Sequence, residues 1–402
     1  MEITTKSRLR FPYINLAIIT ITLVAFISPT IGVFTSPVQK LIMIGSWYFY
    51  ILIFENKGSF PKSFAVFLVF WWMYELILRI LDISSASIGN YYSLLCFYDL
   101  VIKSIYILYN YNDKEKEFTF YLLYIFIIIT IVESLFTYRI YGDELIRYLH
   151  NRSIFEDTGI KFVGTEFYNS LIFFIGILFY KYKVTNNRWK KWLSILGIIL
   201  AYYFMLTIET RTTSLFCSLI LLFTINYGTG LNNSKKLITI IAIFILLLSS
   251  QLWIPLLISI VPERVALRLS ALFMGSGDDE GYLSRFALMK VDINTFFGSL
   301  TNFVFGVGDH RGSDKWGIIG QHSYFLDTLA RYGIIGLTYL IIFCRKYWKS
   351  YNEAISDSLQ KSFFISCFIM FLFLSVNSNT FDVTVGSTLF IMLSTSFNKK
   401  II

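Results

Sequence analysis

The sequence has little charge and few of the side chains that bind metals. Of its 402 residues only 15% are charged, and it contains four cysteines and three histidines. The cysteines fall in or beside long apolar runs and lack the spacing of metal ligands, so we interpret them as buried small residues rather than as ligands or disulfide partners. They are Cys96, Cys217, Cys344 and Cys367. With so little polar sequence, no soluble domain is large enough to fold alone.

Hydrophobic residues, in contrast, make up 55% of the chain and aromatic residues 19%. Apolar runs of about 20 residues recur along the sequence, and each is long enough to cross the hydrocarbon core of a bilayer. The runs are continuous rather than alternating, which excludes a β-barrel. The sequence therefore predicts an all-α, polytopic integral membrane protein that forms a single transmembrane domain over residues 1–402.

About twelve transmembrane helices are expected from the apolar runs. The expected spans are 11–29, 38–54, 62–81, 88–109, 118–136, 163–180, 189–208, 213–227, 237–261, 322–343, 362–376 and 383–397. Two pairs of opposite charges inside these spans are four residues apart, a spacing that favours ion pairing along a helix. These pairs are Asp99 with Lys103, and Glu75 with Arg79.

Lysine and arginine fall on alternate connections between the spans, which predicts the orientation of the chain. If the N-terminus is cytoplasmic, every connection assigned to that side is basic, and the richest lies between residues 181 and 191. We therefore expect both termini in the cytoplasm and an uncleaved signal anchor at the N-terminus. The net charge of +9 is explained by this topology and not by binding of nucleic acid.

Two outward-facing segments are long, residues 137–162 and residues 262–321. Within the second and larger loop, residues 283–297 carry apolar side chains near helical spacing. We expect this stretch to form an amphipathic helix along the outer membrane surface. The loop continues into a polar stretch with a Gly-x-Gly at Gly306 and Gly308, shortly before the span that begins at His322.

Three residues at the outward side are the main catalytic candidates. Arg211 lies at an outward turn between two spans and Arg285 in the large loop, and a charge at the membrane edge is costly unless it is paired or useful. The alternative for both is an arginine that only anchors the chain at the lipid headgroups. His322 offers an imidazole that can accept a proton from a hydroxyl group, although a histidine without a catalytic role is the alternative. His150 and His310 are weaker candidates.

Further candidates for substrate binding surround His322 in the sequence. A tight turn at Gly306 and Gly308 could expose backbone N–H groups to an anion, or it could be a simple turn. Asp309 is a possible partner of His322. Arg331 lies nearly three turns into the span that follows His322, and we hold it as a lesser candidate for substrate contact.

In this order, the motifs resemble those of the O-antigen polymerase and O-antigen ligase superfamily, integral-membrane glycosyltransferases that use glycans linked to polyprenyl diphosphate. The residues that carry the resemblance are Glu209-Thr210-Arg211-Thr212, Ser284-Arg285, Gly306-Val307-Gly308, and His322-Ser323 followed by Phe325-Leu326, Leu329, Tyr332-Gly333 and Gly336-Leu337. The resemblance covers about residues 207–340. The family commonly has Ser before its first Arg and Asn after its His, where this chain has Thr210 and Ser323.

The resemblance implies a GT-C-like glycosyltransferase of the bacterial inner membrane with its active site facing the periplasm. Its substrates would be oligosaccharide repeat units linked to undecaprenyl diphosphate, and a polysaccharide chain-length regulator would be a further partner. Arg211 and Arg285 would bind the departing diphosphate, since a guanidinium offers bidentate hydrogen bonds to phosphate oxygens. His322 would bind or deprotonate the acceptor hydroxyl.

We expect neither a metal nor another cofactor. The outward side has no Asp-x-Asp motif, and its one acidic cluster, Asp278-Asp279-Glu280, is interpreted as a solvated loop, with a metal site as the alternative.

Other activities stay open. A polymerase would pass the glycan to another lipid-linked repeat unit, and a composition rich in Ile, Phe, Tyr, Asn and Lys favours it; a ligase would pass the glycan to lipid A core. A flippase or other transporter would be expected to keep its ionisable residues at the bilayer midplane, in broken helices of two related halves. A noncatalytic membrane partner protein would explain the topology but not the set of two arginines and a histidine.

Overall fold

The computed structural model of this chain consists of packed helices. It describes residues 17–18, 37–54, 62–80, 88–149, 165–207, 217–218, 221–222, 225, 280–308, 323–355, 357–377 and 383–397. Within these ranges every regular element is helical and none is a strand. Four helices are long and apolar enough to cross a membrane, over residues 113–142, 188–207, 324–354 and 358–375. The described chain is thus all-helical and has the helices of a membrane protein.

The elements are α3 (Pro37–Phe54), α4 (Lys62–Ile80), α5 (Ile88–Asn110), α6 (Asp113–Leu149), α8 (Thr165–Val184), α9 (Arg188–Thr207), α14 (Glu280–Phe297), α15 (Leu300–Phe305), α16 (Tyr324–Ala354), α17 (Ser358–Asn377), α18 (Val383–Gly386), the π-helical η1 (Ser387–Ile391) and α19 (Met392–Ser396). Apart from α14 and α15, which lie in the expected loop 262–321, they overlap the expected spans, and α6 continues beyond the span 118–136 into the expected outward segment 137–162. The expected spans 11–29, 213–227 and 237–261 lie wholly or mostly outside the described residues. The count of twelve spans stays a prediction, because three expected spans lie wholly or mostly outside the described residues; within the described ranges, four helices are long and apolar enough to cross a membrane.

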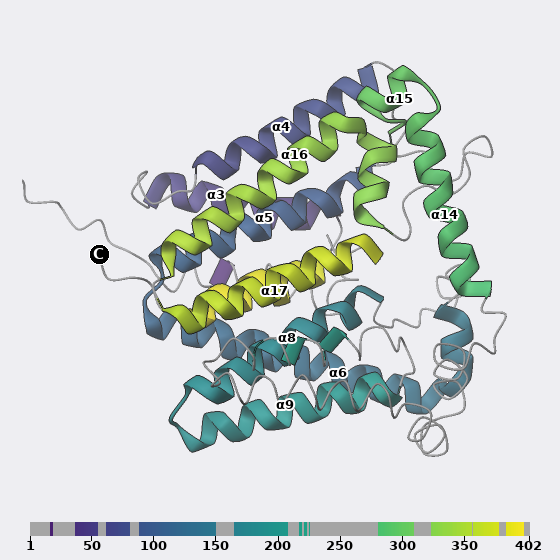
Figure 1. The fold of residues 1–402 in the computed structure, drawn as a ribbon. Coiled ribbons are helices and arrows are strands. Elements are labelled where there is room, and N and C mark those ends of the chain that lie inside the picture. The colour runs from purple at the N-terminus through teal and green to yellow at the C-terminus, as the bar shows by residue number, and fades with distance from the viewer. Residues whose placement is uncertain are drawn as a thin grey trace, which may run out of the picture.

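The long helices run side by side, and α14 crosses one end of them (Figure 1). In order of packing, α3 and α4 lie against α5, α16 lies against α5 and α17, and α8 joins α17 to α9 and so to α6. Helix α14 packs against α15 and α16 at that end. The bundle therefore has one end that is covered by a crossing helix.

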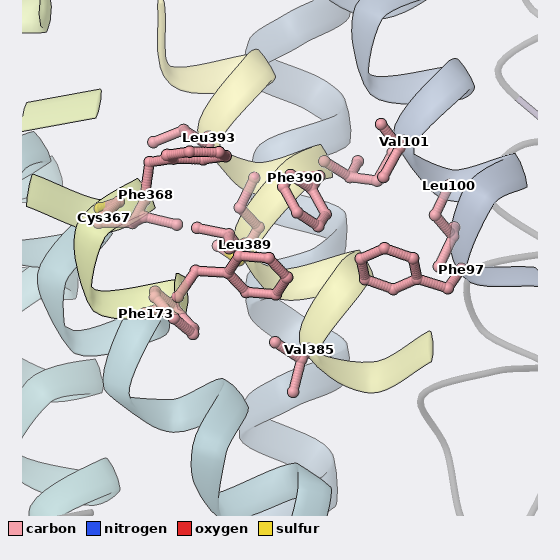
Figure 2. Packing of buried hydrophobic residues seen from close by; sticks show 14 of the residues in the cluster. Phe97, Leu100, Val101, Phe173, Cys367, Phe368, Val385, Leu389, Phe390 and Leu393 are labelled. Carbon is pink, nitrogen blue, oxygen red and sulfur yellow. The ribbon is translucent and has the colours of Figure 1, made fainter. Parts of the chain in front are cut away.

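The core is centred on the C-terminal segment α18–η1–α19. Side chains of α5, α8 and α17 converge on this segment (Figure 2). The ring of Phe390 in η1 stands edge-on to Phe97 of α5 and to Phe371 of α17, with 5.4 Å between ring centroids in each case. Gly386 permits close packing here, because a β-carbon at this position would lie 3.2 Å from the Phe97 ring. Burial of these aromatic rings thus stabilises the segment α18–η1–α19 in the middle of the bundle.

One of the two predicted ion pairs lies inside this bundle. The Lys103 Nζ is 2.7 Å from the Asp99 Oδ2, and both side chains are fully buried. The same lysine lies over the ring of Trp47, with 5.3 Å to the centroid. The predicted pairing of Asp99 with Lys103 is confirmed. For the second pair the backbone belongs to α4, but the side chains of Glu75 and Arg79 lie outside the described part of the structure.

Large apolar side chains cover much of the outer surface of the bundle. Exposed examples on α4, α6, α9 and α17 are Val66, Val69, Ile80, Ile125, Ile129, Phe136, Leu196, Ile199, Ile369 and Phe373. Apolar surfaces of this extent do not face water in soluble proteins and indicate contact with lipid or another apolar partner.

Segments predicted to lie on the same side of the membrane meet at the same end of the bundle. At the predicted inner end, the Tyr109 hydroxyl donates to the Ser350 carbonyl at 2.9 Å, and the Lys116 ammonium donates to the Phe397 carbonyl at 3.0 Å. At the other end, the Tyr74 hydroxyl donates to the Tyr332 carbonyl at 2.9 Å. The packing agrees with the alternation of basic connections in the sequence.

Cys217 and Cys367 are buried and Cys344 is half-buried, as expected for small residues of the bundle, and all three are free thiols. The Cys96 side chain and the predicted signal anchor lie outside the described residues.

Candidate functional site

The motif residues that follow the large loop form one packed unit at the end covered by α14. The Val307 N–H donates to the Ala330 carbonyl and the Gly308 N–H to the Arg331 carbonyl, both at 2.9 Å. Helix α14, which carries Arg285, packs against α15 and α16. The segments with Ser284-Arg285, with Gly306-Val307-Gly308 and with the start of α16 therefore lie together (Figure 1).

A bend in α16 makes this packing possible. Gly333 has φ 61° and ψ −163°, so the first turns of α16 leave the axis of the remaining helix. A β-carbon at Gly333 would come closer than 3.0 Å to the carbonyl of Val304, in α15. Gly306 has φ 76°, and a β-carbon there would come closer than 3.0 Å to the carbonyl of Arg331. Only glycine fits both conditions, a positive φ and a backbone in direct contact.

Tyr74 and Trp71 of α4 secure the bend. The Tyr74 hydroxyl donates to the Tyr332 carbonyl at 2.9 Å and lies 3.3 Å from the Phe305 carbonyl. The Trp71 ring packs edge-on against the Tyr332 ring with 4.8 Å between centroids. A bend frees backbone carbonyls from the helix, and the tyrosine hydroxyl satisfies one of them in a buried position.

The turn does not present its backbone N–H groups to an anion. The Gly306 N–H donates to the Asn302 carbonyl at 2.8 Å, and the N–H groups of Val307 and Gly308 donate to α16. All three donors are used inside the protein, so the glycines serve close packing rather than anion binding. Any contact of this unit with a negatively charged substrate would have to come from side chains.

Arg331 lies beside this turn. The sequence analysis placed it nearly three turns into a straight span, but α16 bends two residues later, so Arg331 belongs to the short segment before the bend. Its carbonyl is the acceptor for Gly308, and its side chain is half-buried. The bend thus moves Arg331 from the interior of a span to the packed motif unit.

Two buried carboxyl groups, which the sequence analysis did not select, lie at the contact between α14 and α16. Asp292 is 3% exposed and Asp327 is 5% exposed, and the two carboxyl groups interact electrostatically. Arg331, one turn further along α16, interacts electrostatically with Asp327. Two carboxyl groups that interact in a buried position favour a proton on one of them. The signal in the sequence was Asp327 itself, a carboxylate inside an apolar span five residues after His322.

Ser323 explains one departure from the family pattern. It is the N-cap of α16, its side chain accepts from the Leu326 N–H at 3.4 Å, and its carbonyl accepts from the Asp327 N–H at 2.8 Å. Asn and Ser are about equally good N-caps. Either residue can therefore begin the helix directly after the histidine.

The predicted amphipathic helix is present as α14, but its faces are not those of a helix on a soluble protein. Asp292, Thr295 and Phe296 are buried, whereas Ile293 is 43% exposed and Phe297 is 70% exposed. The exposed positions thus include apolar residues next to the polar Lys290 and Asn294. This pattern fits a helix that contacts lipid on its outer face.

Several candidates lie outside the described residues: Arg211, Asp309, His322, His150, His310 and the Asp278-Asp279 pair. Arg285 is placed by its backbone in α14, and its side chain is also outside the described part. Over the described ranges, no three His, Cys, Asp or Glu side chains gather to form a metal site. The structure therefore brings together Gly306, Gly308, Arg331 and the helix of Arg285.

Comparison with known proteins finds no protein-family model that matches this chain and no curated protein that matches it.

Proposed function

We propose that the chain is a surface-polysaccharide polymerase of the O-antigen type. It would transfer a growing glycan from undecaprenyl diphosphate to a sugar of another lipid-linked repeat unit, at the periplasmic face of the bacterial inner membrane. The observation that supports this most is the packing of the Ser-Arg helix, the Gly-x-Gly turn and the start of α16 into one unit. These segments follow one another in the chain, and they pack together at the end of the bundle that the charge pattern predicts to face outward.

The proposed reaction is a displacement at the anomeric carbon. The acceptor hydroxyl oxygen forms the new glycosidic bond, the bond between that carbon and the diphosphate oxygen breaks, and the electron pair leaves with the diphosphate. His322 takes the proton of the acceptor hydroxyl. Arg211 and Arg285 stabilise the growing negative charge on the diphosphate. Diphosphate is a weak base, so its departure needs no general acid.

The packed motif unit would hold these catalytic side chains in position. Ser323 fixes the start of α16 directly after His322, and the bend at Gly333 sets the direction of that short segment. Asp292, Asp327 and Arg331 form a buried polar group next to it. In this proposal they orient the catalytic segment and hold a proton close to it, and Arg331 adds positive charge on the side of the diphosphate.

A ligase that passes the glycan to lipid A core would use the same residues, so it stays as an alternative. A transporter is a further alternative, and the pair Asp99–Lys103 is the observation that bears on it, since ionisable residues inside membrane bundles often mark transport pathways. Both side chains are paired at 2.7 Å and fully enclosed. A closed, neutralised pair favours a structural role.

The test in cells uses a strain that makes the repeat unit but lacks its own polymerase. Expression of this chain should restore long glycan chains, and the variants Arg211→Ala, Arg285→Ala and His322→Ala should each abolish them while the protein still inserts into the membrane. Wild-type chain lengths in all three variants would contradict the site assignment. Attachment of single repeat units to lipid A core, without longer chains, would support the ligase instead.

A further inference from the structure

A second polar site lies at the opposite end of the bundle from α14. A cavity of about 270 Å³ opens there between the first turn of α6, the last turn of α8, the first turns of α9 and α17, and the end of α19. Three lysines and two carboxylates line it, so the cavity carries one net positive charge. They are Lys116, Lys181, Lys190, Asp113 and Glu117. This end is the predicted cytoplasmic one and has no part in the proposed glycosyl transfer.

Of the three lysines in this cavity, Lys181 is the one with neither an ion pair nor a hydrogen bond within the described ranges. Lys190 forms an ion pair with Glu117, and Lys116 donates to the carbonyls of Leu108 and Phe397 at 3.2 and 3.0 Å. Lys181 makes no ion pair within the described ranges, and its ammonium lies 4.9 Å from the centroid of the Phe120 ring. An ammonium that lines a cavity beside an aromatic ring and makes no direct ion pair is suited to an external anion.

The cavity also offers groups for a neutral polar partner. Gln360 of α17 lines it and is 8% exposed, and no donor among the described residues reaches its buried Oε1. Thr395 and Ser396 of α19 line the same space. A buried acceptor without a donor is costly, so a ligand that carries a hydroxyl beside its anionic group would satisfy both Gln360 and Lys181.

The neighbouring aromatic residues place the cavity at the height of lipid headgroups. Trp189 is 76% exposed and Trp192 is 65% exposed, both in the first turns of α9 next to Lys190. Exposed tryptophans beside lysines at the end of an apolar helix are the usual mark of the membrane interface. A phospholipid at this interface would bring its phosphate to the level of Lys181.

We propose that this cavity binds the headgroup of an anionic glycerophospholipid from the inner leaflet. The lipid phosphate would contact Lys181 and Lys190, and a headgroup hydroxyl would donate to Gln360. Phosphatidylglycerol has this chemistry, with one phosphate charge and two hydroxyl groups.

The pH dependence of binding follows from Lys181, which lies directly after the expected span 163–180. Loss of water around its ammonium lowers the pKa of Lys181 to about 8; the charges of Lys190 and Lys116 act in the same direction, and those of Glu117 and Asp113 oppose it. The residues that α17 and α19 contribute to the cavity are uncharged. Deprotonation of Lys181 removes its attraction for the phosphate, so affinity should be highest below about pH 8 and should fall as the pH rises above it.

The experiment titrates purified full-length protein in a nonionic detergent with dioctanoyl phosphatidylglycerol. Lys181→Gln should weaken binding about tenfold or more, as expected for loss of a hydrogen bond to a charged group. Lys183→Gln is the matched control, because it removes a lysine from the same last turn of α8 that does not line the cavity. It should leave the affinity unchanged.

Each of the following outcomes would overturn the proposal. Equal affinities of the wild type and Lys181→Gln for the lipid would show that Lys181 does not bind it. Equal losses of affinity in Lys181→Gln and Lys183→Gln would show that the effect is not specific to the cavity. Inorganic phosphate that binds as tightly as the lipid would point to a free-anion site instead. If Lys181→Gln does not fold, Gln360→Glu provides the second variant, since a carboxylate in the cavity should repel the phosphate. The wild-type pH series needs no variant, and an affinity that does not fall above pH 8 would also contradict the proposal.

Discussion

Gly306 lies against the main chain of Arg331, so close that a β-carbon at position 306 would come within 3.0 Å of the Arg331 carbonyl. The next residues continue the contact through two backbone hydrogen bonds to α16. This relationship joins the end of the large loop to the helix that follows His322. The two parts of the motif are therefore held by backbone rather than by adaptable side chains.

Gly306→Ala should destabilise the protein by more than about 3 kcal/mol, because the alanine must adopt a positive φ and its methyl group has no space. The measurement is thermal unfolding of the purified protein in detergent, followed by glycan chain length in cells. Gly45→Ala is the control, since a β-carbon at Gly45 would meet nothing within 4 Å. Equal unfolding temperatures for the two variants would mean that the contact at Gly306 is not maintained in solution.

The helices and the motif segments could be predicted from the sequence because apolar runs and charge alternation are local signals. The apolar side chains of residues 283–297 recur near helical spacing, and the pairing of Asp99 with Lys103 follows from a separation of four residues. The count of spans is not tested, since the expected spans 11–29, 213–227 and 237–261 lie wholly or mostly outside the residues that the structure describes.

The bend in α16 could not be predicted in the same way. Tyr332-Gly333 reads as part of a continuous apolar span, and a glycine inside a helix is often tolerated. Its positive φ is set by contacts from elsewhere, namely the carbonyl of Val304 and the hydroxyl of Tyr74. The interaction of Asp292 with Asp327 could not be predicted either, because it depends on how α14 crosses the bundle.

The buried pair Asp99–Lys103 should be strongly coupled. Lys103→Met alone should destabilise the protein by about 3–5 kcal/mol, because it leaves an uncompensated buried carboxylate. The double variant Asp99→Asn/Lys103→Met should recover most of this loss. A double-mutant cycle on unfolding in detergent measures the coupling. Strictly additive effects of the two substitutions would show that the pair does not form.

Asp327→Asn should lower the rate of glycan extension by about a hundredfold if the carboxyl pair holds a proton for the reaction. It should also alter the pH–rate profile, which a purely structural role would leave in place. Glu353→Gln is a suitable control, because Glu353 is 61% exposed in a loose pair with Lys349 at 3.8 Å. A normal rate with an unchanged profile for Asp327→Asn would remove the acid pair from the mechanism.

Arg285→Lys should be nearly as inactive as Arg285→Ala, since an ammonium keeps the charge but cannot form the bidentate fork to a diphosphate. The rate of extension at saturating substrate is the quantity to compare. Lys290→Ala, at an exposed position of the same helix, should retain activity. Full activity of Arg285→Lys would mean that position 285 supplies only a positive charge and no bidentate hydrogen bonds.

The most direct test of the proposed function is an assay with purified protein and its undecaprenyl-diphosphate-linked repeat unit as the only substrate. Polymerase activity predicts a ladder of longer glycans on a gel from the wild type and none from His322→Ala. Folded wild-type protein that extends nothing from the matching repeat unit would contradict the proposal, and so would a His322→Ala variant that produces the same ladder.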